Sequence, residues 1–256
     1  MAESPERMLV RIQLAEQGER FDEMKEYVKC LVKDYPDYLE KHGALDLLSV
    51  AFKNAVGERR SAWRVMNDIV DQCTQEEVDK QGQEEAEAKK DKAKTGTEVK
   101  RELAKEYMDV LEKEITNICE DLLTLLEKHL LEAATAPDTR VLLFKLKGDY
   151  PRYMAEISTG EKRTVSVTAA TTAYQQAMEL AMKELLPTNP NRLGLVLNIS
   201  LFYYTILDSR EKACNIGNKG VELAEENIEA AEKETWEESL RIIQVIKNNV
   251  KNWTSE

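Results

Sequence analysis

Histidine, cysteine, glycine and proline are all scarce in this chain of 256 residues. It has two histidines and four cysteines, and no two cysteines form a CxxC pair. The sequence therefore offers no recognisable zinc site and little histidine for a general base. Widely spaced cysteines of this kind fit reduced, mostly buried thiols in the cytosol. We expect a protein that is not an enzyme and that uses no metal and no cofactor.

Long apolar runs and net positive charge are missing as well. No apolar run approaches the length that spans a membrane, and the N-terminus lacks the layout of a signal peptide. The formal net charge of −12 argues against a general nucleic-acid binder or a binder of anionic membranes. We expect a cytoplasmic protein with no nucleic-acid and no membrane partner, in which any phosphate site is a local basic island.

Apolar residues instead recur at helical spacing along most of the chain, and no segment alternates convincingly with the period of two of a strand. Few glycines and prolines in a chain that is 33% charged also favour helices. Short turns between helices imply antiparallel neighbours, so the sequence predicts an all-α bundle of about nine helices. The expected ranges are 5–17, 21–36, 44–74, 99–131, 139–160, 164–186, 193–207, 210–231 and 234–252.

Residues 75–97 differ in composition from the rest of the chain. The segment QEEVDKQGQEEAEAKKDKAKTGT holds one valine and no larger apolar residue, so it cannot bury a face. It is either a solvated extension of the neighbouring helices or a disordered loop, and its glycines favour disorder at the centre. Because the flanking helices would pack as a hairpin, we expect residues 1–256 to form a single domain that carries a charged insertion.

The stretch SVAFKNAVGERRSAWR, residues 49–64, places cations beside an apolar stripe when it is drawn as a helix. Lys53, Arg60 and Arg64 share one face, because spacings of seven and eleven residues return a helix to about the same direction. Such a row can bind an anion, although a solvated basic face is the commoner meaning of this pattern. Arg59 lies toward the apolar stripe, where we expect it to have an internal carboxylate partner.

A second stretch, FKLKGDYPRYMAEISTGEKR at residues 144–163, contains Arg152 and Tyr153. A guanidinium and a phenol hydroxyl suit the three acceptor oxygens of a phosphate, although packing is the commoner role of such a pair. Pro151 stands directly before Arg152 and should kink its helix, because proline removes a backbone donor.

Two later stretches each carry an asparagine in apolar surroundings. In RLGLVLNISLFYY, residues 192–204, Asn198 needs a partner, which is either an internal group or the backbone of a bound peptide. In SLRIIQVIKNNVKNWTS, residues 239–255, Asn249 and Trp253 share one face, and a core plug is the commoner role for such a tryptophan.

These four stretches, in this order and together with LAEQGERFDEM at residues 14–24, closely resemble the 14-3-3 family of dimeric adaptors. The resemblance covers most of the chain. It implies nine antiparallel helices that form a cup with a concave groove and that pair into a dimer. It also implies that each cup binds phosphoserine or phosphothreonine in an extended segment of a client protein.

The match of motifs also implies the roles of individual residues. The phosphate clamp would comprise Lys53, Arg60, Arg152 and Tyr153, with Arg64 as a supporting charge. The rest of the peptide groove would comprise Val50, Leu197, Asn198, Leu201, Val245, Asn249 and Trp253. In this reading the two asparagines hold the peptide backbone, the aliphatic residues form an apolar wall opposite the clamp, and Trp253 lies at the rim. The dimer interface would comprise Leu14, Gly18, Arg20, Ala62, Met66, Tyr107 and Glu114, with a cross-subunit ion pair between Arg20 and Glu114.

Several positions depart from the family pattern. Thr205 stands where the family usually has a glutamate near the groove, which puts a preference for basic residues beside the phosphosite in doubt. Pro151 should shift Arg152 or loosen its turn, and Asn252 should make the groove wall wetter. Ala62 replaces an often phosphorylatable serine, so we expect that switch to be absent.

The sequence thus predicts a phosphoserine- and phosphothreonine-dependent adaptor. Its partners would be phosphorylated client proteins and a second subunit, which is either a copy of itself in a homodimer or a paralogue in a heterodimer. The alternative is a phosphate-independent scaffold that resembles a helical-repeat protein and has a degenerate groove. The expected location is the cytoplasm, with the nucleus reached through clients.

Overall fold

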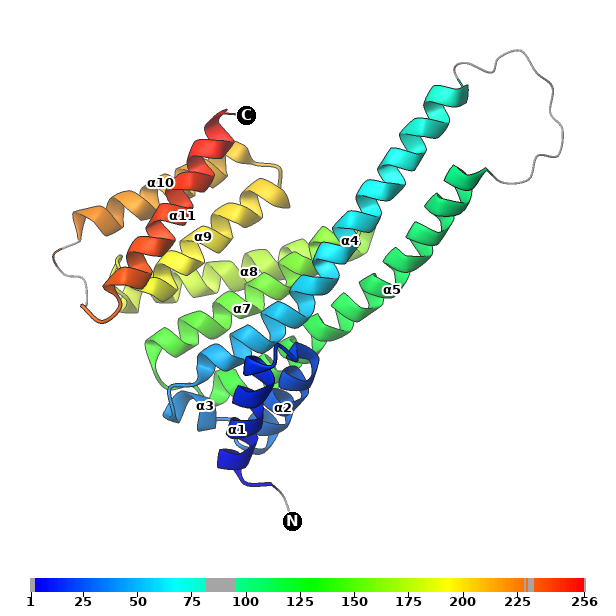
Figure 1. Cartoon of the computed structure of the whole chain (residues 1–256). Coiled ribbons are helices and arrows are strands. Elements are labelled where there is room, and N and C mark those ends of the chain that lie inside the picture. The colour runs from blue at the N-terminus through cyan, green and yellow to red at the C-terminus, as the bar shows by residue number, and fades with distance from the viewer. Residues whose placement is uncertain (1–2, 82–94, 228, 230–232, 256) are drawn as a thin grey trace.

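The computed structural model of the chain describes residues 3–81, 95–227, 229 and 233–255, and all its regular structure there is helical (Figure 1). Within these residues there is no strand, and nine helices have seven or more residues, so the prediction of an all-α fold is confirmed. The nine are α1 (Pro5–Gln17), α2 (Phe21–Asp34), α4 (Leu45–Gln81), α5 (Gly96–Leu125), α7 (Pro137–Glu156), α8 (Gly160–Glu184), α9 (Pro190–Thr205), α10 (Arg210–Glu226) and α11 (Trp236–Ser255). Three short elements are α3 (Tyr38–Lys41), a π-helical turn (Leu126–Leu130) and α6 (Leu131–Ala133).

Local sequence signals explain where several helices begin. Proline occupies the first turn of α1, α7 and α9, where its missing N–H costs nothing. A capping box begins α5, because the Glu98 N–H donates to Thr95 Oγ1 at 3.2 Å and the Thr95 N–H donates to Glu98 Oε2 at 2.6 Å. The Asn189 side chain accepts from the N–H of Asn191 at 2.9 Å and so caps α9.

The helices α4 and α5 extend farther than the sequence suggested and run side by side beyond the other helices (Figure 1). The helix expected to end at residue 74 continues to Gln81, and its partner begins at Gly96. An ion pair between Arg101 and Glu77 joins the two extensions. The described ends of the charged insertion are therefore solvated helix, whereas its centre, where we expected disorder, lies outside the described residues.

Other boundaries also moved. The connector expected between the second and third helices contains the short helix α3, and the long helix expected to end at residue 131 changes into the π-helical turn after Leu125. The helix α10 ends at Glu226, earlier than the expected residue 231. Helix ends fray, and the last turn often changes its hydrogen-bonding pattern, so the sequence determines these boundaries less sharply than the helices themselves.

Three apolar clusters form the core and link the helices in order. The first lies among α1, α2, α4, α5 and α7, and it contains the fully buried Leu48, Phe52 and Val56 from the predicted apolar stripe. The second lies among α7, α8 and α9, and the third among α9, α10 and α11. Because α7 and α9 each take part in two clusters, their positions relative to α4 and α11 are determined by continuous packing.

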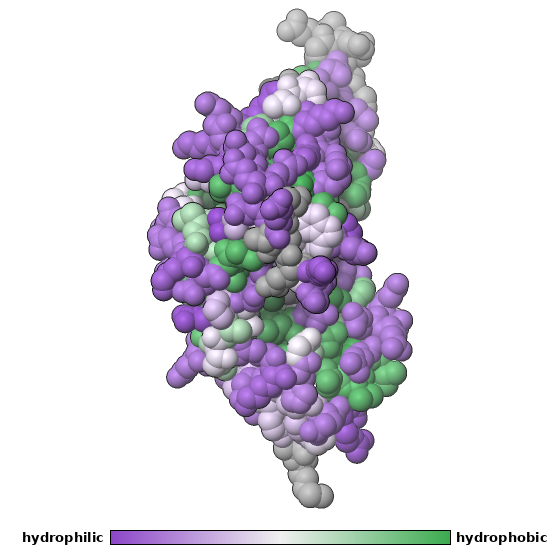
Figure 2. All heavy atoms as spheres, turned by 90° about the vertical axis from the view of Figure 1, so that its left-hand side faces the viewer, coloured by the Kyte–Doolittle hydropathy of each residue, from purple (hydrophilic) through white to green (hydrophobic). Residues whose placement is uncertain are grey.

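The exterior is mostly polar, as the net charge requires. In the face that Figure 2 shows, hydrophilic side chains dominate, and apolar side chains gather mainly in its lower half. Among the described residues, none of the helices is both long enough and apolar enough to cross a membrane.

Candidate functional site

Two arginines from different helices meet at one tyrosine ring. The guanidinium of Arg60 on α4 lies 3.7 Å from the centre of the Tyr153 ring on α7, and that of Arg152 lies 4.6 Å from the same ring. A guanidinium over an aromatic face is attracted by the quadrupole of the ring. Three of the four predicted clamp residues are therefore in contact, and Arg60 does not belong to a merely solvated face.

Glu156 holds the cationic face of α4 against α7. Its Oε2 atom accepts from Nε and Nη2 of Arg60 at 2.8 and 2.6 Å, and its Oε1 atom accepts from Nε of Arg64 at 2.6 Å. Arg64 thus shares a carboxylate with Arg60, and its side chain is 53% exposed. One carboxylate between two arginines leaves an excess of positive charge at this place.

Lys53 lies two turns before Arg60 on α4 and is exposed. In the part of the chain that the structure describes, its ammonium has no hydrogen bond and no ion pair. The structure therefore does not bring Lys53 into contact with the other clamp residues. A free ammonium on this helix face remains available to an anion.

Asp149 is the buried centre of a polar network below the clamp. Only 3% of this residue is exposed, and its carboxylate accepts hydrogen bonds from the Tyr174 hydroxyl at 2.6 Å and from Lys145 Nζ at 3.1 Å. The Arg152 Nε atom donates to the same Tyr174 hydroxyl at 3.1 Å. Burial alone would raise the pKa of Asp149, but the charges of Lys145 and Arg152 and the Tyr174 hydroxyl hold it below its usual value. Asp149 is consequently a carboxylate at neutral pH.

Asn198 on α9 receives its partner from this network. Its Nδ2 atom lies 2.8 Å from both carboxylate oxygens of Asp149, so the amide nitrogen has an internal acceptor. The sequence left two kinds of partner open for Asn198, an internal group and the backbone of a bound peptide. For its NH2 group the structure shows the internal one. The contact joins α9 to α7 next to the clamp.

Four residues of the site were not singled out from the sequence: Lys145, Asp149, Glu156 and Tyr174. For three of them a signal existed, because Lys145, Asp149 and Arg152 are spaced four and three residues apart, as ion pairs on one helix face are. Glu156 lies four residues after Arg152 on that helix. Tyr174, on α8, had no comparable signal.

The predicted groove wall lies on α9 and α11. Leu197 and Leu201 are half-buried on α9, and Asn249 is half-buried on α11, where Val245 is 44% exposed. Lys247 pairs with Glu225 of α10, and helical geometry places Val245 and Asn249 on the flank opposite to Lys247. These two residues therefore face away from α10.

The structure also places Val50 and Trp253, two further residues predicted for the groove. Val50 is on α4, on the cationic side of the site rather than on the wall opposite. Trp253 is only 5% exposed, and its ring stacks on Tyr204 with the centroids 4.6 Å apart. In this structure Trp253 plugs the third core cluster, and a role at the rim of the groove stays a prediction.

Pro151 lies inside α7, and residues on both sides of it are helical to Glu156. Because proline has no N–H, the carbonyl of Lys147 loses its usual partner in the helix. The helix nevertheless continues through this turn to Glu156, and Arg152 is 92% buried and donates to the Tyr174 hydroxyl. The expected bend at Pro151 stays a prediction.

The predicted dimer residues are partly exposed apolar side chains. Leu14 on α1 and Tyr107 on α5 are 61% and 59% exposed, and Ala62 and Met66 on α4 are half-buried. The exposed Gly18 follows α1 directly. Exposed apolar side chains of this size are a feature of interfaces when they are contiguous.

The charged residues of that region are paired within the chain. Arg20 bonds Glu23, whereas Glu114 accepts from Arg59 Nε at 2.9 Å. Arg59 also bonds Asp22 at 2.8 Å, so the expected carboxylate partner of Arg59 is confirmed. The cross-subunit pair of Arg20 with Glu114 stays a prediction.

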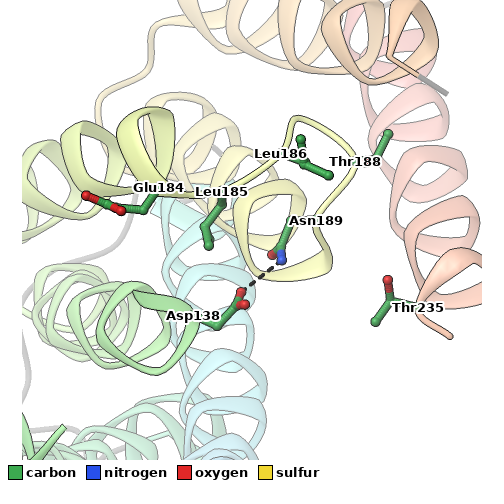
Figure 3. Close-up of a pocket in the computed structure, with 7 residues that line it drawn as sticks. All are labelled: Asp138, Glu184, Leu185, Leu186, Thr188, Asn189 and Thr235. Atoms are coloured by element: carbon green, nitrogen blue, oxygen red, sulfur yellow. Dashed lines mark hydrogen bonds between the residues drawn. The ribbon is translucent and has the colours of Figure 1, made fainter. Parts of the chain in front are cut away.

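A small polar cavity of about 100 Å³ lies between the start of α7 and the turn that joins α8 to α9 (Figure 3). Its lining residues are Asp138, Glu184, Leu185, Leu186, Thr188, Asn189 and Thr235. Asn189 Nδ2 donates to Asp138 Oδ1 at 2.9 Å, as the dashed line in Figure 3 shows. None of the predicted site residues lines it, and the described residues contain no cluster that could hold a metal ion.

Comparison with known proteins agrees with this architecture. The family model described as 14-3-3 protein matches residues 11–254. The 14-3-3 protein beta/alpha of Gallus gallus is 37% identical over 249 residues, which are 97% of this chain and 93% of that protein. The human protein of the same name is 37% identical over 97% of this chain and 92% of its own length, and the Xenopus tropicalis protein is 36% identical over 97% and 93%. The chain therefore belongs to the 14-3-3 family, whose members are adaptors without enzymatic activity.

Proposed function

We propose that this chain binds phosphoserine- or phosphothreonine-containing segments of client proteins in the groove between α4 and α7 on one side and α9 and α11 on the other. The observation that carries the proposal is the pair of guanidiniums, from Arg60 and Arg152, on the ring of Tyr153. Their helices come from distant parts of the sequence, and the contact concentrates positive charge at one point of an acidic molecule.

A phosphate monoester suits this arrangement chemically. It carries nearly two negative charges and three acceptor oxygens, which guanidinium groups bind with charge-assisted hydrogen bonds. Four cations, Arg60, Arg64, Lys145 and Arg152, pair with only two carboxylates, Asp149 and Glu156. Lys53 adds a fifth positive charge on the same face of α4 without a carboxylate partner among the described residues. The surplus of positive charge favours an incoming dianion.

The apolar wall supports binding of a peptide rather than of a free phosphate. Leu197, Leu201 and Val245 offer partly exposed aliphatic surface on the two helices of the wall. An extended segment can place its phosphate on the clamp and its neighbouring side chains on this surface.

Fluorescence anisotropy with one peptide in its phosphorylated and unphosphorylated forms tests the proposal. The phosphorylated form should bind much more tightly. The Arg60→Ala variant should lose most of that difference, because truncating one partner of a buried charge pair costs about 2–5 kcal/mol, about 30- to 5,000-fold in affinity. Arg140→Ala, an exposed arginine at the other end of α7, is the matched control and should bind as the unaltered protein does. Equal affinity for the two peptide forms would favour the phosphate-independent scaffold instead.

We further propose that the chain acts as a dimer in the cytoplasm, with itself or with a paralogue. Large apolar side chains are more than half exposed on α1, α4 and α5, namely Val10, Leu14, Val65, Leu103, Tyr107 and Val110. Leu103, Tyr107 and Val110 follow one stripe of α5 at helical spacing, and a two-fold axis would cover this stripe with α1 of a second copy.

A further inference from the structure

We infer that Asp149 is a positioning residue that makes Asn198 present its side-chain carbonyl oxygen to the ligand, so that the groove accepts one backbone N–H beside the phosphorylated residue. This inference rests on the proposed function, because it concerns how the same groove holds the peptide backbone. The peptide N–H is the donor and Asn198 the acceptor of this hydrogen bond, and the Asp149 carboxylate is the reason for that direction.

The orientation of the Asn198 amide follows from its neighbour. Both oxygens of Asp149 lie 2.8 Å from the nitrogen of the Asn198 amide. An ionised carboxylate only accepts hydrogen bonds, so it can face the NH2 group of the amide but not its oxygen. If the Asn198 amide were flipped, its carbonyl oxygen would face the two oxygens of Asp149. Three acceptors without a proton between them would then repel one another in a buried place.

The carbonyl oxygen of Asn198 is left free for a ligand. Within the described part of the chain this oxygen accepts no hydrogen bond, and it does not belong to the buried atoms that lack a partner. It therefore reaches solvent on the same half-buried flank of α9 as Leu201. A carbonyl oxygen without a partner can bind only a hydrogen-bond donor. An extended peptide whose phosphate lies on the clamp offers a backbone N–H as that donor.

Asp149 can impose this orientation because it is itself held firmly. Lys145 and the Tyr174 hydroxyl bond it directly, and Arg152 Nη2 lies 3.7 Å from its Oδ1 atom. Through Tyr174 the same network also bonds Arg152 of the clamp. The Arg152 guanidinium and the Asn198 amide thus both belong to the hydrogen-bond network of one buried carboxylate.

The test uses phosphopeptides in which one backbone amide at a time, on either side of the phosphoserine, is replaced by an ester. The ester removes a single N–H donor and leaves the side chains unchanged. At one position the replacement should weaken binding by up to about tenfold, the amount that one hydrogen bond contributes. In the Asn198→Ala variant the amide and ester peptides should bind equally.

Asp149→Asn then tests the positioning role. A neutral amide at this place can donate as well as accept, so it no longer dictates how Asn198 is turned. The penalty for the ester should fall by at least half, even if overall affinity also falls, because the penalty is a ratio within each variant. Asp138→Asn, an exposed change on the same helix, is the matched control and should retain the full penalty.

Several outcomes would overturn the inference. They are the absence of any position with an ester penalty, a penalty that survives in Asn198→Ala, or a full penalty in a folded Asp149→Asn variant. If Asp149→Asn does not fold, nuclear magnetic resonance of the unaltered protein decides, since the Asn198 side-chain NH2 signals should stay nearly unchanged on peptide binding. A large shift of these signals would show that the amide donates to the ligand. Equal binding of phosphorylated and unphosphorylated all-amide peptides is a separate result, which would refute the proposed function instead.

Discussion

The guanidinium of Arg60 lies over the ring of Tyr153, 3.7 Å from its centre, and this contact joins the two helices that carry the proposed clamp. Glu156 reinforces the same junction with two hydrogen bonds to Arg60. The tyrosine therefore has two separable parts, a ring that supports Arg60 and a hydroxyl that is available to a phosphate.

Two substitutions at Tyr153 separate those parts. Tyr153→Phe keeps the ring and should weaken phosphopeptide binding by about 10- to 150-fold, because a hydrogen bond to a charged group contributes about 1.5–3 kcal/mol. Tyr153→Ala should weaken it further, since Arg60 also loses its aromatic support. Anisotropy with the phosphorylated peptide measures both losses. Unaltered affinity in Tyr153→Phe would show that the hydroxyl does not touch the phosphate.

Thr205 is exposed at the end of α9, and its hydroxyl donates back to the carbonyl of Leu201 at 2.8 Å. It offers no charge to a basic residue of the ligand. We expect the unaltered protein to bind phosphopeptides with arginine or alanine beside the phosphoserine about equally well. Thr205→Glu should favour the arginine peptide by a few fold, as an exposed ion pair contributes about 0.2–1 kcal/mol. A strong preference for arginine in the unaltered protein would contradict this prediction.

Gly148 and Gly57 form a matched pair for testing how tightly the site is packed. A Cβ atom at Gly148 would lie 2.5 Å from the Tyr174 ring, which the bonds to Asp149 and Arg152 hold in place, whereas one at Gly57 would meet nothing within 4 Å. Gly148→Ala should lower the free energy of unfolding by about 1–3 kcal/mol. Gly57→Ala should raise it by about 0.5–1 kcal/mol, because alanine loses less entropy in a helix. Urea unfolding at one protein concentration measures both, and equal effects would refute the packing argument.

The cysteines should differ sharply in reactivity. Burial raises the pKa of the Cys119 thiol to about 12, whereas Cys30 is exposed. In the native protein at pH 8 a short pulse of iodoacetamide should label Cys30 first and leave Cys119 unlabelled, as peptide mass spectrometry can show. Rapid labelling of Cys119 without unfolding would contradict its burial.

The raised pKa of the Cys119 thiol predicts that the free energy of unfolding decreases at high pH. Its folded pKa of about 12 exceeds the ordinary value of 9.0, so folding favours the protonated form. The resulting stability is fully present below about pH 9 and is lost as the pH rises from there toward 12. Cys119→Ala should show a smaller decline in the free energy of unfolding between pH 8 and pH 10.

The dimer proposal is tested by two aspartates placed on similarly exposed side chains. Leu14 on α1 is 61% exposed and lies in the proposed interface, whereas Met182 on α8 is 58% exposed and lies outside it. Leu14→Asp should convert the dimer to a monomer in analytical ultracentrifugation, because a charge would be buried without a partner. Met182→Asp should leave the dimer intact. A Leu14→Asp protein that stays fully dimeric would rule out this interface.

The sequence alone predicted the helical fold and several of the features of the candidate site. Apolar spacing and the glycine that follows placed the first helix at residues 5–17, as the structure has it. A guanidinium beside an apolar stripe cannot remain unpaired, so the carboxylate partner of Arg59 was also predictable. Helical spacing likewise placed Lys53, Arg60 and Arg64 on one face, whereas the role expected for Arg152 and Tyr153 came from the resemblance of residues 144–163 to the 14-3-3 family.

The tertiary structure alone decided how those faces meet. Helical spacing tells which residues share a face of one helix, but it contains no information on which face of another helix will cover it. Tyr174 and Asn198 lie 25 and 49 residues from Asp149, and only the packing of α7, α8 and α9 brings all three together. That packing gives the Asn198 amide an internal carboxylate partner and sets the basic face of α4 against Tyr153 and Glu156 of α7, because the partners of a polar side chain are set by its neighbours in space.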